Sequence, residues 1–202
     1  MRRSIGLCLA VVVASLLASS YSRAAAKPED TVRSFYATLL DTMKRGPELG
    51  SKGRYDMLEP EIRRAFDLSS MARMAVGSAW STLAPEQQQR LTDAFARYTT
   101  ATYADRFDSY SGEKFEVTGT QDNAFGKIVL SRIVKSNGEP VSINYLMRNN
   151  RDDWQIGDVY LTGTISQVAT LRSQFGSVLA RQGADGLVNT LNRKADTLVA
   201  AE

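Results

Sequence analysis

The acidic side chains are the first candidates for catalysis in this sequence, because the chain contains no histidine. Asp152 and Asp153 are adjacent and form a candidate catalytic pair. The alternative is a solvated turn, because segment 149–153 is polar throughout and neighbouring residues of a strand point to opposite faces. Three further acidic residues have no spacing that indicates acid–base catalysis: Glu113, Glu116 and Asp158. Carboxylates distant in the sequence can still meet in a folded chain, so a hydrolase with paired carboxylates stays an alternative.

Most other catalytic chemistry is excluded by composition. The single cysteine, Cys8, lies near the N-terminus, and residues 27–202 contain neither cysteine nor histidine. This part of the chain therefore cannot form a Ser-His-Asp triad, a cysteine nucleophile, a zinc site built from Cys and His, or a disulfide. We expect no metal and no cofactor.

Methionine and aromatic side chains recur along the chain and are candidates for contact with an apolar ligand. Methionine is flexible and polarisable, and it suits surfaces that accept variable apolar ligands. Ordinary core packing is the alternative. Periodicity alone does not distinguish the wall of a cavity from a filled core.

The positive charge of the chain is confined to its N-terminal segment. The sequence has 25 Lys and Arg against 22 Asp and Glu, a formal net charge of +3. Arg2, Arg3 and Arg23 are the only charged residues among the first 26, and they account for the whole excess. Residues 27–202 are therefore neutral overall and hold no basic cluster interleaved with aromatics, which argues against nucleic-acid binding.

Segment 1–26 has the features of a secretory signal peptide. A positive n-region precedes Ile5–Leu17, an apolar stretch too short to span a bilayer, and Ala24–Ala26 is a small-residue cleavage pattern. We expect cleavage near Ala26 and a single domain over residues 27–202; an uncleaved membrane anchor is the alternative. Export without cysteine fits a bacterial periplasm, where a sizeable core replaces disulfides.

An acidic stretch over residues 105–122 is a candidate docking surface for a basic partner. It holds five acidic side chains against two basic ones. The alternative is an ordinary solvated helix end followed by a hairpin.

The elements that must position these groups begin with helices. Pro28–Arg45 has apolar residues at i, +3, +4, +7, +8 and +11, a continuous stripe, and acidic residues in its first turn. Glycines and a proline in 46–53 predict a loop, and Arg54–Phe66 predicts a shorter helix. Pro85–Tyr110 predicts a long helix with two apolar stripes, so it should contact neighbours on two sides.

The period changes in the middle of the chain and predicts an antiparallel meander. The four expected strands are Phe115–Thr120, Lys127–Ser136, Glu139–Arg148 and Trp154–Leu161. Asn137–Gly138 is typical of a type I′ hairpin turn. Alternate residues from Val141 to Met147 are apolar, so one face of the sheet should be covered. Two further helices, separated at Gly183, close the chain. The expected class is α+β, a four-stranded curved antiparallel meander packed by amphipathic helices.

Several segments resemble the periplasmic lipid-carrier family of the outer-membrane lipid asymmetry (Mla-type) and toluene-tolerance ABC systems. The resemblance covers residues 28–199. It rests on FYATLLDTM (35–43), FDLSSMARMAVGSAW (66–80), the helix Pro85–Tyr110 and WQIGDVYLTGTISQVATLRSQF (154–175). Within the last segment, seven residues match the family pattern: Trp154, Asp158, Val159, Gly163, Ser166, Arg172 and Phe175.

One departure from this pattern concerns the serine. In the phospholipid carriers the serine usually lies two residues after the glycine, whereas here both Thr164 and Ile165 separate Gly163 from Ser166. GRYDMLEP (53–60), RFDSYSGEKFEV (106–117) and GTISQVATLRSQF (163–175) are more similar to the hopanoid-associated branch. That similarity implies a pentacyclic triterpenoid or a related lipid as cargo.

The resemblance implies a fold with an apolar cavity between sheet and helices, and no catalysis. It implies a periplasmic shuttle that carries a hopanoid or a phospholipid between an inner-membrane lipid transporter and an outer-membrane acceptor complex. The residues expected to line the cavity and bind lipid are Phe35, Leu39, Met71, Met74, Val76, Trp80, Phe95, Tyr98, Tyr103, Tyr145 and Met147. The alternatives are the hydrolase described above and a non-carrier adaptor within an envelope complex, which would have a filled interior and an exposed apolar patch.

Overall fold

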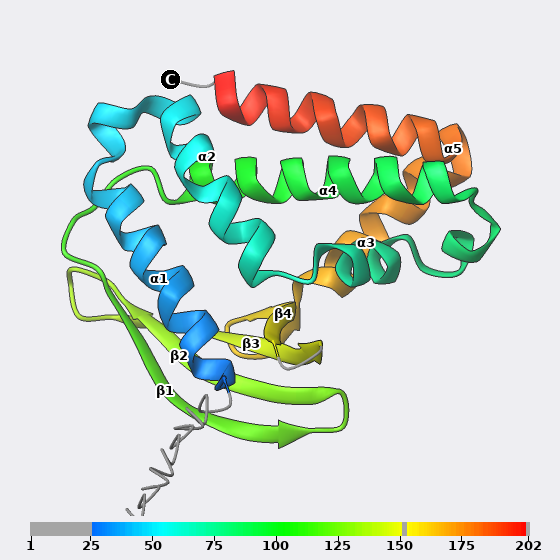
Figure 1. Ribbon diagram of the computed structural model, residues 1–202. Coiled ribbons are helices and arrows are strands. Elements are labelled where there is room, and N and C mark those ends of the chain that lie inside the picture. Colours follow the sequence, from blue (N-terminus) through cyan, green and yellow to red (C-terminus); the bar gives the residue numbers. More distant parts are fainter. Residues whose placement is uncertain (1–25, 151–152, 201–202) are drawn as a thin grey trace, which may run out of the picture.

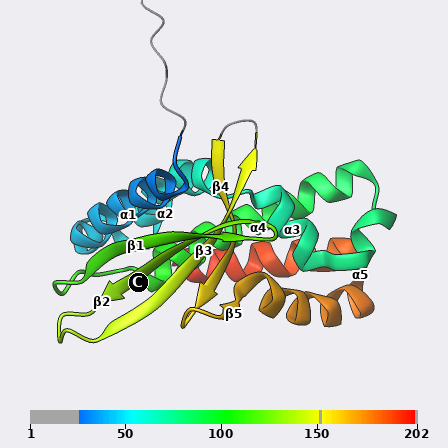
Figure 2. The same ribbon diagram turned by 90° about the horizontal axis from the view of Figure 1, so that it is seen from below.

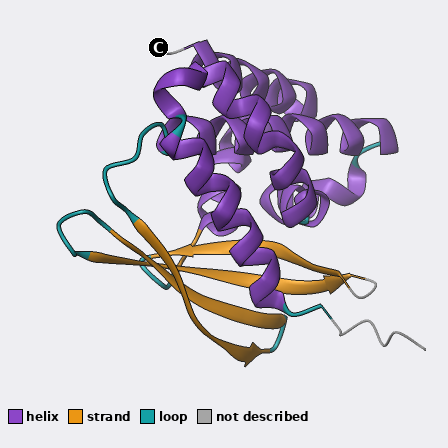
Figure 3. Ribbon diagram, turned by 60° about the vertical axis from the view of Figure 1, so that its left-hand side comes forward, coloured by secondary structure: helices purple, strands orange, loops and turns teal. Residues whose placement is uncertain are grey.

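All long helices lie on one side of an antiparallel sheet in the computed structural model, which describes residues 26–150 and 153–200 (Figures 1 and 3). The signal-peptide prediction falls almost entirely outside the described residues, and so does Asp152. The elements in chain order are α1 (Pro28–Lys44), α2 (Gly46–Ala65), α3 (Leu68–Val76), the 3₁₀ helix η1 (Gly77–Thr82), α4 (Pro85–Arg106), β1 (Lys114–Asn123), β2 (Gly126–Val134), β3 (Pro140–Asn150), β4 (Asp153–Leu161), β5 (Ile165–Ser166) and α5 (Gln167–Ala200). None of the helices in the described part of the chain is long and apolar enough to cross a membrane.

The sheet is the predicted meander with one addition. Its order is β1-β2-β3-β4-β5, and every pair of neighbours is antiparallel. Four strands were expected, and the structure adds the two-residue β5, which pairs with the end of β4. The chain reverses there through Thr162 and Gly163, with φ of 50° and 83°. This sharp turn brings Ser166 opposite Tyr160.

The hairpin expected at Asn137–Gly138 is present, but its turn is of a different type. A type I′ turn needs positive φ at both central residues. Of the residues in this turn, Gly138 alone has a positive φ, 87°. The Gly138 N–H donates to Lys135 O at 2.9 Å, which makes Ser136 and Asn137 the corners and places glycine at the bulge position after them.

Helix α1 covers the sheet with the predicted apolar stripe. Five of its apolar side chains are buried: Val32, Phe35, Tyr36, Leu39 and Met43. The Tyr36 hydroxyl and Ser131 Oγ on β2 are 2.6 Å apart, and the Thr31 hydroxyl donates to Trp154 O on β4 at 2.8 Å. These two hydrogen bonds fix the helix across the strands.

The loop expected over 46–53 is instead part of α2. Within this helix Gly50 alone is non-helical, with φ 58° and ψ 177°. Pro47 occupies the first turn, where a proline costs no hydrogen bond. The Arg54 guanidinium donates to Gly46 O at 3.3 Å and to Ala104 O at 2.8 Å, so it ties the first turn of α2 to the end of α4. The glycine and proline signals therefore mark a kinked helix start, and not an open loop.

Helices α4 and α5 form the layer farthest from the sheet. Figure 1 shows α4 and the C-terminal half of α5 side by side, joined by Arg90–Asp185 (2.7 Å) and Arg97–Asp196 (2.5 Å). The predicted break is present inside α5 at Gly183, with φ 65° and ψ −169°. Figure 2 shows the first half of α5 running from β5, while the second half lies against α4. Helix α4 ends at Arg106 and not at Tyr110, because the chain then turns toward β1.

Candidate functional site

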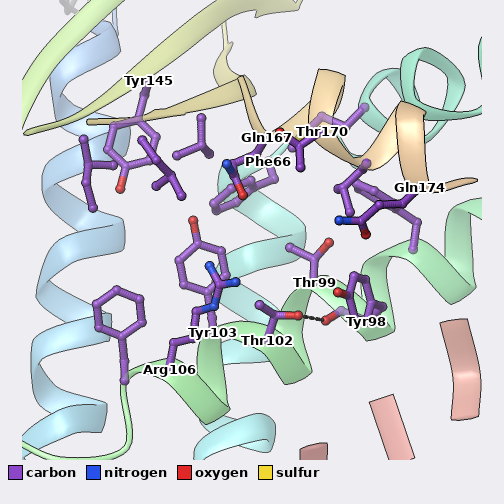
Figure 4. Close-up of a pocket in the computed structure, with 17 residues that line it drawn as sticks. Phe66, Tyr98, Thr99, Thr102, Tyr103, Arg106, Tyr145, Gln167, Thr170 and Gln174 are labelled. Carbon is purple, nitrogen blue, oxygen red and sulfur yellow. Dashed lines mark hydrogen bonds between the residues drawn. The ribbon is translucent and has the colours of Figure 1, made fainter. Parts of the chain in front are cut away.

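A cavity of about 310 Å³ lies between the sheet and the helical layer (Figure 4). Five elements and the residues that follow α2 and α4 contribute to its wall. The lining residues are Phe66, Met71, Phe95, Tyr98, Thr99, Thr102, Tyr103, Arg106, Phe107, Ile143, Tyr145, Val159, Leu161, Gln167, Thr170, Leu171 and Gln174. Its volume is at the lower end of the range for small-molecule sites, about 300–1,000 Å³.

Aromatic rings make one wall of the cavity rigid. Phe35 lies behind this wall, with its ring centroid 5.1 Å from that of Phe66 and 5.2 Å from that of Tyr103, both edge-to-face. Tyr103 stacks on Phe107 at 5.8 Å. Such pairs contribute about 0.5–1.5 kcal/mol each beyond the burial of area. These contacts hold the rings of the wall against one another.

Three tyrosines in or behind this wall have a pKa above the ordinary value of tyrosine. Burial raises the pKa of Tyr103, and burial together with the neighbouring Tyr36 and Tyr103 raises the pKa of Tyr145 well above its ordinary value. Burial also raises the pKa of Tyr36, against the opposing effect of its hydrogen bond with Ser131. These hydroxyls are therefore neutral polar groups next to the cavity, and they bring no negative charge to it.

A band of polar side chains borders the cavity beside the aromatic wall. Helix α4 contributes Thr99, Thr102 and Arg106, and the first half of α5 contributes Gln167, Thr170 and Gln174. Both sets have the spacing i, i+3, i+7, which places each set along one face of its helix. Figure 4 shows the two sets on opposite sides of the cavity. We call these six residues the polar band.

The eleven predicted lining residues divide into three groups. Five lie in the cavity wall: Met71, Phe95, Tyr98, Tyr103 and Tyr145. Two, Met74 and Trp80, line a second groove described below. The other four are buried in the core and line neither space: Phe35, Leu39, Val76 and Met147. Phe35 and Leu39 are enclosed because α1 packs directly on the sheet. The lipid-binding role of all eleven stays a prediction.

The polar band was not found from the sequence. The threonines, glutamines and arginine that form it are unremarkable individually. The helical spacing of 99, 102 and 106 and of 167, 170 and 174 is readable in the sequence, but nothing local indicates that the two helix faces oppose each other. Phe66 was missed as well, because it lies between two helices and belongs to no periodic stripe.

The second groove is more open and has a volume of about 610 Å³. It lies between α3–η1 and the start of α5, and its lining includes Arg73, Trp80, Asp158 and Arg172. The Arg172 guanidinium lies over Gly77, where a side chain would collide with it. The two spaces share no lining residue.

Asp158 is a buried carboxylate that lines the second groove, and its hydrogen bonds are structural. Its oxygens accept from the N–H of Val159 (2.8 Å), the N–H of Val168 (3.1 Å) and the Ser166 hydroxyl (2.5 Å). Ser166 Oγ in turn accepts from the N–H of Ala169 at 2.9 Å. This pair therefore caps α5, where a negative charge is favoured by the helix dipole.

The cavity offers no acidic group for acid–base catalysis. Its lining contains neither Asp nor Glu. No group of three His, Cys, Asp or Glu side chains that could hold a metal ion occurs in residues 26–150 and 153–200. Asp153 is exposed at the start of β4, opposite Asn150 and away from the cavity. This cavity therefore gives no support to hydrolysis by paired carboxylates.

A helical layer on one face of an antiparallel meander, with a mainly apolar cavity between them, defines an α+β domain built to enclose a ligand. The chain belongs to the MlaC family: the family model, described as MlaC protein, matches residues 33–193. This confirms the Mla-type resemblance and the α+β class. The chain is also similar to a solved structure of a phospholipid-binding protein from Ralstonia solanacearum in complex with a phospholipid. The two are 26% identical with a TM-score of 0.74, and the match covers 86% of this chain and 99% of that one.

Proposed function

We propose that the protein is a periplasmic carrier that binds a lipid in the cavity and transfers it between inner- and outer-membrane complexes without catalysis. The observation that carries this proposal is the cavity itself, walled by aromatic rings and lacking acidic groups, in a chain of the MlaC family. The phospholipid bound by the Ralstonia solanacearum protein supports it. The cargo is a phospholipid or, as the resemblance of three segments implies, a hopanoid.

Simple energetics require a partner at each end of the transfer. Burying one methylene from water contributes about 0.8 kcal/mol. Two long acyl chains would together contribute roughly 20 kcal/mol, near the ceiling for non-covalent affinity. A lipid held in this way would almost never leave into water. Release therefore depends on docking to a complex that offers an equally apolar path, namely an inner-membrane transporter or an outer-membrane acceptor.

The kink that divides α5 at Gly183 supports a path by which lipid could enter and leave the cavity. The first half of α5 contributes Gln167, Thr170, Leu171 and Gln174 to the cavity wall. The second half is tied to α4 by two ion pairs beyond Gly183. A glycine with positive φ between the two halves permits the first to move while the second stays in place. We infer that lipid enters and leaves between α4 and the first half of α5.

The proposed location depends on the N-terminal segment. Helix α1 begins at Pro28, so cleavage near Ala26 would remove no element of the domain. We propose that residues 1–26 direct export and that residues 27–202 function as one domain in the periplasm.

The decisive experiment is lipid extraction and uptake. The full precursor is expressed in a bacterium, the protein is purified from the periplasm without detergent, and bound lipid is identified by mass spectrometry. The same spectra give the N-terminal residue after processing. We expect co-purified lipid and uptake of lipid from vesicles by the stripped protein. Absence of both would overturn the carrier proposal.

A matched pair of variants tests whether the cavity is the binding site. Leu171→Trp fills the cavity from α5, whereas Ser177→Trp adds the same side chain to an exposed position of that helix. We expect Leu171→Trp to lose most lipid uptake and Ser177→Trp to retain it, with thermal unfolding verifying that both are folded. Equal uptake by the two folded variants would place the lipid elsewhere.

A further inference from the structure

One charged side chain lies in a cavity that is otherwise neutral. Arg106 is the only Asp, Glu, Lys or Arg among the lining residues of the described chain. It is the last residue of α4 and is itself exposed. Figure 4 shows its guanidinium beside Tyr103, on the cavity side of the helix. A guanidinium is always ionised and offers five N–H donors in a planar fork.

The other arginines of α4 make this position distinctive. Arg90 and Arg97 pair with Asp185 and Asp196 on α5. No ion pair or hydrogen bond to the Arg106 side chain is present among residues 26–150 and 153–200. The three arginines thus differ in their partners, and the one without a partner faces the cavity.

The polar band places further donors opposite Arg106. The side-chain amides of Gln167 and Gln174 have no hydrogen-bond partner within the described chain. Thr102 and Thr170 instead donate to carbonyls of their own helices, at 2.8 Å to Tyr98 O and 2.9 Å to Ser166 O. The available donors of the polar band are therefore one guanidinium, two amides and the Thr99 hydroxyl, and no carboxylate among the described lining residues competes for them.

We propose that Arg106, together with Gln167 and Gln174, binds the phosphodiester of a lipid headgroup and makes the carrier prefer phosphate-bearing lipids to neutral ones. This inference rests on the proposed function. The apolar end of the cavity, formed by Phe66, Ile143 and Val159, then receives the acyl chains. Planar guanidinium groups match the oxygens of a phosphate in a bidentate arrangement. No other charged side chain of the described residues lines the cavity to select the group attached to the phosphate, so phosphatidylglycerol and phosphatidylethanolamine should be accepted alike.

The test is a competition between lipids of equal chain length. Stripped protein is equilibrated with vesicles that contain phosphatidylglycerol, phosphatidylethanolamine and diacylglycerol, and the bound lipids are quantified by mass spectrometry. We expect the wild type to enrich both phospholipids over diacylglycerol by about tenfold, the size expected for one charge-assisted hydrogen-bonding group. Arg106→Gln should lose this enrichment and still take up diacylglycerol.

Two further variants distinguish three effects: the positive charge at position 106, the planar shape of the guanidinium, and the net charge of the protein. Arg106→Lys keeps the charge without the fork and should retain part of the enrichment. Arg181→Gln removes the same charge from an exposed position of α5 that lines neither space, and it should behave as the wild type. High salt should reduce the enrichment of the wild type and leave that of Arg106→Gln unchanged.

The outcomes distinguish this inference from the proposed function. If the wild type takes up no lipid of any kind, the carrier proposal fails. If it takes up lipid but enriches phospholipid no more than Arg106→Gln does, the carrier stands and the role of Arg106 is overturned. Enrichment lost equally in Arg181→Gln would also overturn it, because the effect would then come from net charge. When a hopanoid is added to the same vesicles, its preference over all three lipids would contradict the phosphodiester site directly.

Discussion

The carboxylate of Asp158 accepts the hydroxyl hydrogen of Ser166 at 2.5 Å, which joins the buried part of β4 to the residue before α5. Ser166 lies three residues after Gly163, one more than the resemblance to the phospholipid carriers implies. The extra residue is accommodated by the turn at Thr162 and Gly163, which pairs β5 with β4. Ser166 borders the second groove and not the cavity, so this departure concerns the capping of a helix more directly than the choice of cargo.

We expect Asp158→Asn to destabilise the fold by about 2–3 kcal/mol, the range for a hydrogen-bonding group with a charged partner. The substitution removes the negative charge at the start of α5 and replaces the oxygen that accepts the Ser166 hydroxyl, while one oxygen is kept for the N–H groups of Val159 and Val168. Urea unfolding measures the change in the free energy of unfolding. Asp105→Asn, at an exposed position of α4, is the control and should change it by no more than about 0.5 kcal/mol. An equal decrease of the free energy of unfolding in both variants would contradict a stabilising role of the Asp158 hydrogen bonds.

Gly183→Ala should destabilise the protein by about 1–3 kcal/mol, because φ 65° with ψ −169° is accessible to almost no residue except glycine. No atom lies within 4 Å of the added methyl group, so the cost is one of backbone conformation and not of collision. Gly176→Ala lies in the same helix, also has free space, and has no positive φ. It should be neutral or stabilising by up to about 1 kcal/mol. The measurement is the thermal unfolding of both variants. A Gly183→Ala variant more stable than the wild type would contradict the positive φ at this residue.

Phe35→Ala tests the distinction between core and cavity wall. The Phe35 ring is 0% exposed and touches no space that a ligand could fill, so its removal should cost about 3–5 kcal/mol. Phe125→Ala applies the same substitution to a ring that is 72% exposed, and it should leave the free energy of unfolding nearly unchanged. Chemical denaturation of both variants is the measurement. A small decrease of the free energy of unfolding in Phe35→Ala would mean that α1 packs less tightly than the structure shows.

Alkaline pH should unfold the protein through its buried tyrosines. Tyrosines of the unfolded chain ionise at about pH 10, whereas burial raises the pKa of Tyr36, Tyr103 and Tyr145 in the folded chain. The folded state therefore binds more protons above about pH 10, and the stability from these groups is complete below that pH and lost above it. We expect the melting temperature to fall as pH rises beyond about 10, together with a rise in tyrosinate absorbance.

A pair of tyrosine variants assigns this effect. Tyr145→Phe should make the decline with pH shallower, because it removes one group that must ionise on unfolding. Tyr110→Phe removes a tyrosine that is 41% exposed and is the matched control. An identical decline in both variants would show that buried tyrosines do not set the alkaline limit.

The helices and strands could be predicted where the spacing of apolar residues along the chain is enough to distinguish a helix from a strand. The stripe on Pro28–Lys44 and the alternation along β3 follow from which side chains must leave water, so helix, strands and meander could be read from spacing. The glycine and proline signals at 46–53 were misread. Glycine and proline affect the backbone conformation only locally. Whether they form a loop or a kinked helix depends on contacts with distant residues, such as the hydrogen bond from Arg54 to Ala104 O.

The sequence by itself determined that the chain is neutral beyond its first 26 residues, that it lacks histidine and cysteine there, and that it alternates between amphipathic helices and a meander. Only the tertiary structure decided which inward-facing residues border a cavity. Phe35 and Tyr103 have equivalent apolar periodicity, yet one is enclosed and the other lines the space. The spacing of apolar residues indicates toward which side of its helix or strand a side chain points. Whether that side chain borders a cavity depends on the distance between the helices and the sheet. That distance is set by contacts between α1, α4, α5 and the sheet, which are remote in sequence. The same contacts bring Arg106 and Gln174 to one cavity.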